Sequence, residues 1–212
     1  MIRNDLDNGP NCTEQHYFRP QDVIAVCRHW GKCRPQARHF VLYRDPDQPF
    51  GCGQMLLDVP SFAQAVKVVT GWGVPLLPVV CKGSQISHSK VNPYQISGFD
   101  RQALEGFSMH VSGVRYRNVF HVIGKGSVEK FLLTLPDGLG AHFIELVDEP
   151  PEWSWFRYWF DVTKITKVKL VPTMGEPPDE PWSVHVRVGD NWVHLHTTDV
   201  DSVIARIEAV TG

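Results

Sequence analysis

Apolar and polar residues alternate in two stretches near the C-terminus, and this period of two predicts a β-hairpin. If the turn lies at residues 189–190, residues 182–188 pair with residues 192–197 and His185 lies opposite His194. A register shifted by one residue would mix the two faces, so burial favours this pairing. The apolar face then carries Val184, Val186, Val188, Val193 and Leu195. The polar face carries Ser183, His185, Arg187, Trp192, His194 and His196.

A helix is predicted directly after this hairpin. Thr198 and Asp201 resemble a capping box at its start. Apolar residues recur at helical spacing at Val200, Val203, Ile204, Ile207 and Val210. We expect this helix to cover the apolar face of the hairpin. The face with the histidines would then point to solvent or to a partner.

The rest of the C-terminal half alternates in the manner of short antiparallel strands. Strands are predicted at residues 114–117, 119–123, 131–135, 141–147, 153–160 and 166–170. Pro136, Asp137 and Gly138 supply a turn between the third and the fourth of them. Several strands closed by one helix predict an antiparallel sheet or a barrel-like domain with a C-terminal helical cap.

The N-terminal half predicts a mixture of helices and strands. Pro20 precedes a predicted helix over residues 21–32, and Ser61 caps a second helix that ends near Gly71. Between the two helices, residues 39–44 and 54–59 are predicted as strands around a turn at residues 45–47. Residues 82–106 are polar and are interpreted as a long connection.

Two segments of the C-terminal half have a family resemblance. Residues 160–171 (FDVTKITKVKLV) and 191–210 (NWVHLHTTDVDSVIARIEAV) resemble the late strands and closing helix of bacterial PH-like domains. The resemblance implies a binding module for phosphoinositides, peptides or proteins. Phosphoinositide-binding members depend on a basic cluster in the first hairpin loop, where this chain has only Arg115, Arg117, Lys125 and Lys130. The resemblance therefore favours a peptide or protein partner over a lipid.

Charge and pattern together suggest two domains of an α+β protein, at residues 1–104 and 105–212. The first half has 11 Lys and Arg against 8 Asp and Glu, and the second has 10 against 15. The chain as a whole has a net charge of −2, which excludes nucleic-acid binding by bulk positive charge alone. The change of sign coincides with the change of pattern from mixed to mainly strand-forming.

Composition narrows the class of protein further. The 42% hydrophobic and 21% charged residues argue against a disordered chain. The longest apolar run, residues 74–81, is far shorter than the roughly 20 residues that cross a bilayer. The polar first ten residues predict no signal peptide, so we expect a cytoplasmic protein whose five cysteines are reduced.

Three histidines on the predicted polar face have the arrangement of a zinc site. His194 and His196 share one strand and His185 lies opposite, so three imidazoles leave a fourth position for water. This arrangement resembles the metal site of α-type carbonic anhydrases and implies a zinc-dependent hydrolase or lyase as an alternative function. No carboxylate is evident nearby to orient the imidazoles, so a polar face in contact with water is the preferred interpretation.

A second group of cysteines and histidines lies near the N-terminus. Its spacing contains no C-x-x-C pair, and Cys27 falls on the apolar side of the predicted helix, where a free cysteine is ordinary core. A structural zinc site and a cysteine nucleophile at Cys12 or Cys33 remain alternatives. The group consists of Cys12, His16, Cys27, His29, Cys33, His39 and Cys52.

Two further stretches are candidate interaction surfaces. A basic stretch interleaved with aromatic residues suggests nucleic-acid binding through Arg28, Lys32, Arg34 and Arg38. The same stretch also fits an ordinary basic surface or one that receives an acidic protein. Residues 153–160 (WSWFRYWF) are aromatic on both sides of a strand, which fits either a buried core or an interface. The residues predicted to contact a partner are Trp153, Trp155, Arg157, Tyr158, Arg187 and Trp192.

The absence of a specific catalytic motif favours a non-enzymatic function. We expect an adaptor or inhibitor that binds another protein, or a second copy of this chain, with no required cofactor. A zinc enzyme that uses His185, His194 and His196 is one alternative. A nucleic-acid-binding protein that uses residues 28–44 is another.

Overall fold

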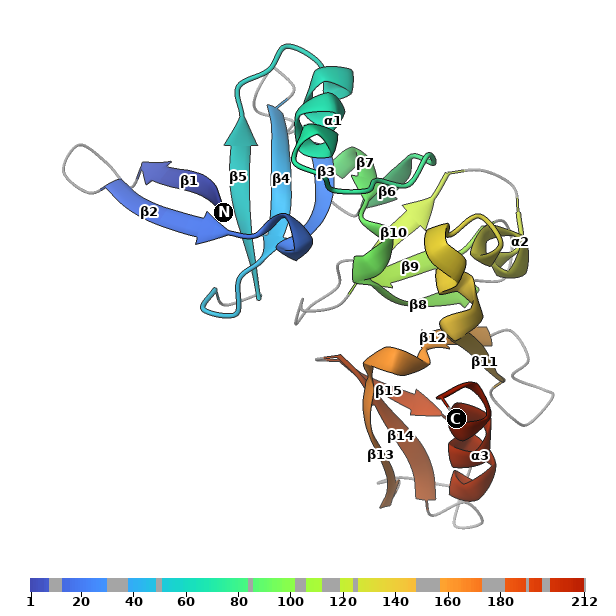
Figure 1. Ribbon diagram of the computed structural model, residues 1–212. Helices are drawn as coiled ribbons and strands as arrows, with labels where there is room; N and C mark the ends of the chain where they lie inside the picture. The colour runs from blue at the N-terminus through green and yellow to red at the C-terminus, as the bar shows by residue number, and fades with distance from the viewer. Residues whose placement is uncertain are drawn as a thin grey trace. The chain divides into compact units, whose positions relative to one another are not determined.

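The structure is a computed structural model with an α+β architecture, as predicted (Figure 1). It describes residues 1–7, 13–29, 38–48, 51–83, 86–101, 106–111, 119–123, 126–147, 157–172, 182–189, 191–195 and 199–211. Within these ranges, every helix is too short or too polar to cross a bilayer.

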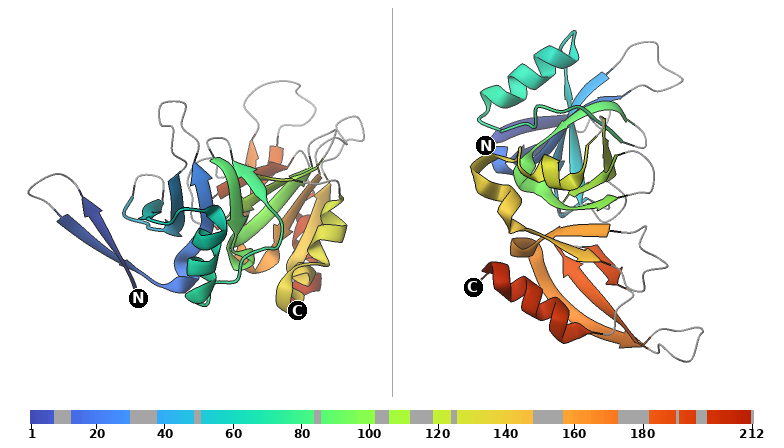
Figure 2. Two further views of the ribbon diagram at one scale, coloured as in Figure 1. Left: turned by 90° about the horizontal axis from the view of Figure 1, so that it is seen from above. Right: turned by 90° about the vertical axis from the view of Figure 1, so that its right-hand side faces the viewer.

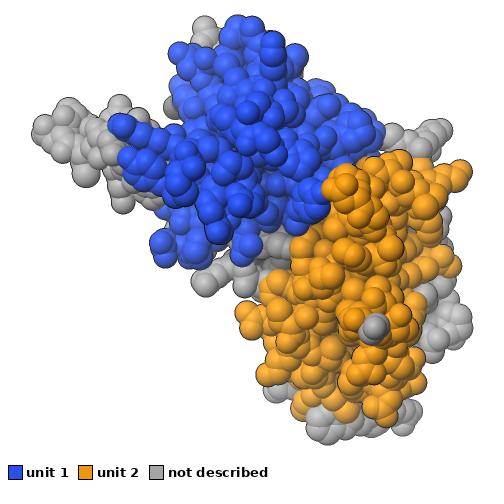
Figure 3. Space-filling model, in the orientation of Figure 1, with its two compact units in different colours: residues 1–95, 113–123 blue, residues 96–112, 124–212 orange. Residues whose placement is uncertain are grey.

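The chain divides into two compact units, which Figure 3 colours separately. The first unit comprises residues 1–95 and 113–123, and the second comprises residues 96–112 and 124–212. Whether residues 1–104 and 105–212 fold as separate domains stays a prediction.

The first unit contains a hairpin of β1 with β2 and an antiparallel sheet in the order β10–β6–β7–β3–β4–β5. Its strands are β1 (Ile2–Asp7), β2 (Thr13–Phe18), β3 (Val23–His29), β4 (Arg38–Arg44), β5 (Cys52–Leu57), β6 (Cys81–Gly83), β7 (Ile86–Val91) and β10 (Val119–Val122). Its helices are α1 (Phe62–Gly71) and the short 3-10 helices η1 (Pro20–Asp22) and η2 (Pro93–Gln95).

The helix predicted over residues 21–32 is wrong, because this segment forms the central strand β3. The strand pairs with β4 on one side and with β7 on the other. Residues from Val23 to Cys27 are all buried, since a central strand covered on both faces is apolar at consecutive positions. A continuous apolar run also contains apolar residues at helical spacing, so the sequence pattern fits both a helix and a strand. Pairing with β4 and β7 makes this segment a strand. Trp30 lies outside the described residues.

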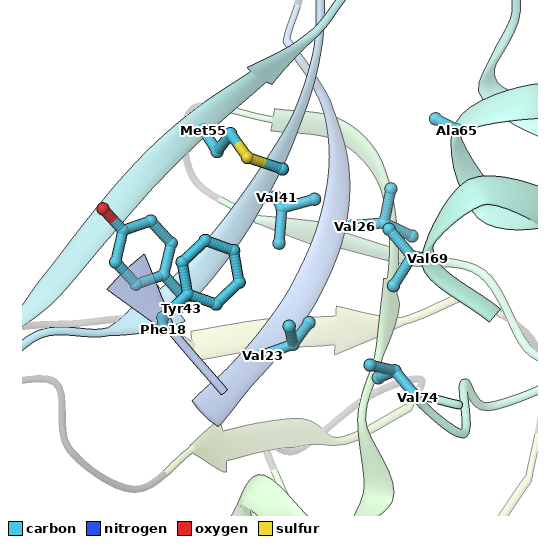
Figure 4. Packing of buried hydrophobic residues seen from close by; sticks show 9 residues of the cluster. All are labelled: Phe18, Val23, Val26, Val41, Tyr43, Met55, Ala65, Val69 and Val74. Atoms are coloured by element: carbon cyan, nitrogen blue, oxygen red, sulfur yellow. The ribbon is translucent and has the colours of Figure 1, made fainter. Parts of the chain in front are cut away.

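The second predicted helix is confirmed as α1. The Ser61 side chain accepts a hydrogen bond from the backbone N–H of Gln64 at 3.2 Å, which caps the helix as expected. Ala65 and Val69 of α1 pack against the sheet, where Val26 and Val41 belong to the same cluster (Figure 4). The strands predicted at residues 39–44 and 54–59 are confirmed as β4 and β5.

The long polar connection predicted at residues 82–106 is wrong. It contains β7 and β8 (Ile96–Arg101), and its polar side chains bond to the backbone of neighbouring strands. Asn92 donates to the carbonyl of Val23 at 2.9 Å, and Ser89 donates to that of Cys81 at 3.2 Å. Residues that suggest a solvated loop therefore satisfy buried backbone groups inside a sheet.

The second unit contains sheets in the order β11–β12–β8–β9 and β13–β14–β15. The remaining strands are β9 (Ser108–Val111), β11 (Phe143–Val147), β12 (Arg157–Asp161), β13 (Ile165–Pro172), β14 (Trp182–Val188) and β15 (Asn191–Leu195). The remaining helices are α2 (Val128–Leu132), α3 (Val200–Thr211) and the 3-10 helices η3 (Pro136–His142) and η5 (Val162–Lys164).

The strand predicted at residues 131–135 is wrong, because α2 begins just before it. Ser127 caps this short helix by accepting a hydrogen bond from the N–H of Lys130, and Phe131 packs against Phe99 and Phe107. Pro136, Asp137 and Gly138 do not form the predicted hairpin turn but begin η3, which is kinked where Asp137 has a left-handed conformation at φ 53°. The strands predicted at 119–123, 141–147, 153–160 and 166–170 correspond to β10, β11, β12 and β13, and residues 114–117 lie outside the described ranges.

The C-terminal hairpin has the predicted register, with His185 opposite His194 and Val188 opposite Asn191. Its valines face a core shared with Ile144 of β11, and α3 lies along the same face (Figure 2). The predicted helical cap is therefore confirmed. Asp199 accepts a hydrogen bond from the N–H of Ser202 at 2.9 Å, whereas Thr198 lies outside the described residues.

Candidate functional site

The outward face of the β13–β14–β15 sheet gathers basic and aromatic side chains from all three strands. Directly paired residues of antiparallel strands point to the same side of a sheet. Val184, Val186 and Val188 point inward and are buried, so His185 and Arg187, which alternate with them, point outward. Ser183, which is predicted on the same polar face, is buried instead. Two rows form this basic face, Lys167–Arg187–Trp192 and Lys169–His185–His194.

Like charges are neighbours on the basic face. Lys167 pairs directly with Arg187. Like charges opposite each other destabilise a sheet. None of the described residues that the register places on this face is acidic. Lys167 and Lys169 therefore give this face positive charge.

Trp192 is the exposed aromatic side chain of the basic face. It is 42% exposed, and the Nζ atom of Lys169 lies 4.2 Å from the centre of its ring. A cation over an indole face at this distance forms a cation–π interaction. The contact holds the lysine and the indole together as one amphipathic surface.

The imidazoles of His185 and His194 lie close together, with ring centres 4.5 Å apart. Partial burial lowers the pKa of His185, and the neighbouring His194 and Lys169 lower it further. The lowered pKa of His185 favours a neutral ring at neutral pH, in which one nitrogen accepts a hydrogen bond and the other donates one.

The structure brings together two of the three histidines predicted as zinc ligands. His196 lies outside the described residues, so the predicted triad stays a prediction. In the part of the chain that is described, no group of three His, Cys, Asp or Glu side chains is close enough to hold a metal. His185 and His194 supply two nitrogen donors from adjacent strands.

The aromatic segment contributes mainly to the core where it is described. Tyr158 stacks on Phe160 at 5.9 Å and packs on the core that the valines of β14 face. Arg157 forms an ion pair with Glu145 at 3.3 Å. Tyr158 and Arg157 therefore make contacts within the fold, whereas Arg187 and Trp192 lie on the outward face of their sheet. Trp153 and Trp155 lie outside the described residues.

The described members of the N-terminal group of cysteines and histidines form no cluster of three that could hold a metal. Cys27 is fully buried, and burial raises the pKa of its thiol, which disfavours the thiolate needed for metal binding or catalysis. Burial also raises the pKa of Cys81 to about 12. His39 is buried with Nδ1 3.2 Å from the carbonyl oxygen of Val59. Cys12 and Cys33 lie outside the described residues.

The basic stretch is only partly described. Arg28 and Arg38 both line a cavity of about 880 Å³ beside α1. Lys32 and Arg34 lie outside the described residues.

Lys167 and Lys169 are the members of the basic face that sequence reasoning did not select. The signal was present, because lysines alternate with apolar residues along residues 166–170. Such alternation places lysines on the outward face once β13 pairs with β14. Comparisons with models of known protein families, with curated proteins and with solved structures found no match.

Proposed function

We propose that the protein is a non-enzymatic binding module, an adaptor or inhibitor, that receives an acidic segment of another protein on the basic face. The position of Lys167 and Lys169 on the same face as the exposed Trp192 carries this proposal. Both lysines alternate with apolar residues along β13, so their charges project from one face of the sheet. An acidic partner provides the complementary charge.

The surroundings of Trp192 favour a protein partner over a nucleic acid. Proteins that bind single strands without sequence preference use open aromatic faces on which bases stack. The Nζ atom of Lys169 lies 4.2 Å from the Trp192 ring centre, on a ring face that a base would need. A carboxylate can pair with that lysine while apolar atoms contact the ring edge. This geometry suits a peptide with both acidic and apolar side chains.

The resemblance to PH-like domains supports the same proposal. Peptide and protein binding is a common function of such domains. The valines of β14 and Val203 of α3 belong to one core cluster, and the basic face is the opposite face of the sheet.

A zinc-dependent hydrolase or lyase is the second candidate, on one observation. The rings of His185 and His194 are 4.5 Å apart on adjacent strands, a suitable start for a metal site. Elemental analysis of the purified chain tests this candidate. One equivalent of zinc that His194→Ala removes would support the enzyme, and metal-free protein would argue against it.

Titration of the full chain with peptides of equal length and increasing glutamate content tests the binding proposal. We expect affinity to rise with glutamate content and to fall with salt. Lys167→Glu should weaken binding roughly tenfold or more, because a repulsive charge replaces an attractive one. The control is Lys67→Glu, a reversal at an exposed position of α1, which should leave affinity unchanged.

Two outcomes would contradict the proposal. One is equal binding of neutral and acidic peptides. The other is a single-stranded oligonucleotide that binds more tightly than the most acidic peptide and loses affinity in Trp192→Ala, because that result would assign the basic face to nucleic acid.

A further inference from the structure

A polar row interrupts the apolar face that α1 covers in the first unit. The register places Arg28 of β3 opposite His88 of β7 and His39 of β4. One level further along the same face, Val26 and Val41 pack in the core under α1 (Figure 4). Because paired residues point to the same side, Arg28 and the two histidines lie on the face that α1 covers.

Phe62, in the first turn of α1, lies over this row. Its ring centre is 6.3 Å from that of His39 and 6.5 Å from that of His88. Arg28 occupies the strand between these two histidines. The aromatic ring and the start of α1 therefore enclose one side of a basic pocket.

Hydrogen-bonding capacity in this row is unused within the described residues. The Nε atom of Arg28 and the Nδ1 atom of His88 are both buried, and neither has a hydrogen-bond partner there. A buried guanidinium nitrogen without an acceptor is costly, and native structures rarely tolerate one. An oxyanion is the acceptor that a guanidinium matches best.

A cavity of about 880 Å³ opens at this place. Arg28 and Arg38 supply its positive charge, while Leu57 and Phe62 supply apolar surface. Asp58 also lines the cavity, but within the described residues neither arginine forms an ion pair with a carboxylate. The volume falls in the range of small-molecule sites, roughly 300–1,000 Å³.

We infer that this cavity binds a small phosphate monoester, with its phosphate on Arg28, a second positive charge from Arg38 at the cavity wall, and its organic part against Leu57 and Phe62. A phosphate monoester carries close to two negative charges at neutral pH, which matches two guanidinium groups better than a single carboxylate does. The N–H groups at the start of α1 carry positive partial charge and add to the attraction. This site lies in the first unit and does not depend on the function proposed for the basic face.

Isothermal titration of the full chain with phenyl phosphate, inorganic phosphate and phenylacetate tests the inference. Phenyl phosphate should bind more tightly than inorganic phosphate, because only the ester has a ring to bury. It should also bind more tightly than phenylacetate, which has the ring but a single charge. Arg28→Gln and Arg38→Gln should each weaken phenyl phosphate binding about tenfold or more, since the first removes a charge-assisted contact and the second removes a positive charge from the cavity wall.

Arg44→Gln is the matched control, because Arg44 is exposed at the opposite end of β4 from Arg38. It should leave phenyl phosphate affinity unchanged. If Arg28→Gln does not fold, as judged by thermal unfolding, the exposed Arg38 still decides the question. No binding of phenyl phosphate, equal affinity for phenylacetate, or unchanged affinity in the folded arginine variants would overturn the inference. So would displacement of phenyl phosphate by a single-stranded oligonucleotide at lower concentration.

Discussion

His185 is the residue of the basic face whose charge responds most directly to its surroundings. Partial burial disfavours its protonated form, and His194 and Lys169 add repulsion. Its folded-state pKa therefore lies below the ordinary value of 6.5. As the pH falls from the ordinary pKa of 6.5 toward the lower pKa of the folded state, the unfolded chain takes up the proton first. The contribution of His185 to the free energy of unfolding therefore decreases over this pH range.

We expect the His185 imidazole to titrate below pH 6.5 when it is followed by NMR in the full chain. Lys169→Gln should raise this pKa toward the ordinary value, because it removes one of the repelling charges. Lys169→Arg should leave it low, because the charge is retained. A bound acidic peptide should raise it as well, so peptide affinity should increase as the pH falls through the same window. An unchanged pKa in Lys169→Gln would show that the neighbouring charge has no effect.

Only part of the candidate sites could be predicted at the level of residues. The pairing of His185 with His194 follows from a local alternation and a short turn, so the sequence alone determines it. The pairing of Arg28 with His88 joins strands that are far apart in the chain. No local pattern in the sequence indicates that pairing. Because residues 21–32 are predicted as a helix, a strand pairing of Arg28 could not be predicted either.

At the scale of elements, local signals succeeded where neighbours in sequence are neighbours in space. The capped helix α1 and the β14–β15 hairpin are both of this kind. Errors arose at β3, β7 and β8, where pairing with distant strands outweighs local preference. Polar residues such as Asn92 indicated a loop, although in the structure they bond to the backbone of the sheet.

The pairing of β8 with β12 depends on a glycine, which allows a direct test. A Cβ atom at Gly98 would lie 2.7 Å from the carbonyl oxygen of Trp159 and 3.2 Å from a ring carbon of Phe160. Gly98→Ala should therefore lower the free energy of unfolding by about 1–3 kcal/mol, measured by urea denaturation. Gly71→Ala is the control, since a Cβ atom there meets nothing within 4 Å. If the two variants are equally stable, the close approach of β8 to β12 is wrong.

At the scale of the whole molecule, the chain passes between the units more than once. β8 and β9 belong to the second unit, residues 113–123 belong to the first, and residue 124 begins the return to the second. A boundary at residue 104 therefore falls between two strands of one unit. Charge and polarity patterns cannot reveal that the chain passes back and forth between units, because each pattern is read over residues that are neighbours in sequence.

This connectivity predicts different behaviour for two fragments that share their C-terminus. Phe99 of β8 is fully buried, with ring centres 5.5 Å from Phe107, 5.7 Å from Phe131 and 5.2 Å from Phe143. A fragment of residues 105–212 lacks this ring and the strand that pairs with both β9 and β12. We expect residues 96–212 to unfold cooperatively in a thermal circular dichroism experiment, and residues 105–212 to show no cooperative transition.

Both fragments contain residues 113–123, so the absence of the first unit affects them equally, and β8 is the main difference. Loss of a buried phenylalanine alone costs about 3–5 kcal/mol, a large part of the stability of a small domain. A cooperative transition of residues 105–212 at the same midpoint as the longer fragment would instead establish the division at residue 104. It would also mean that the sheet β11–β12 is held by the core it shares with β14 and α3, without help from β8.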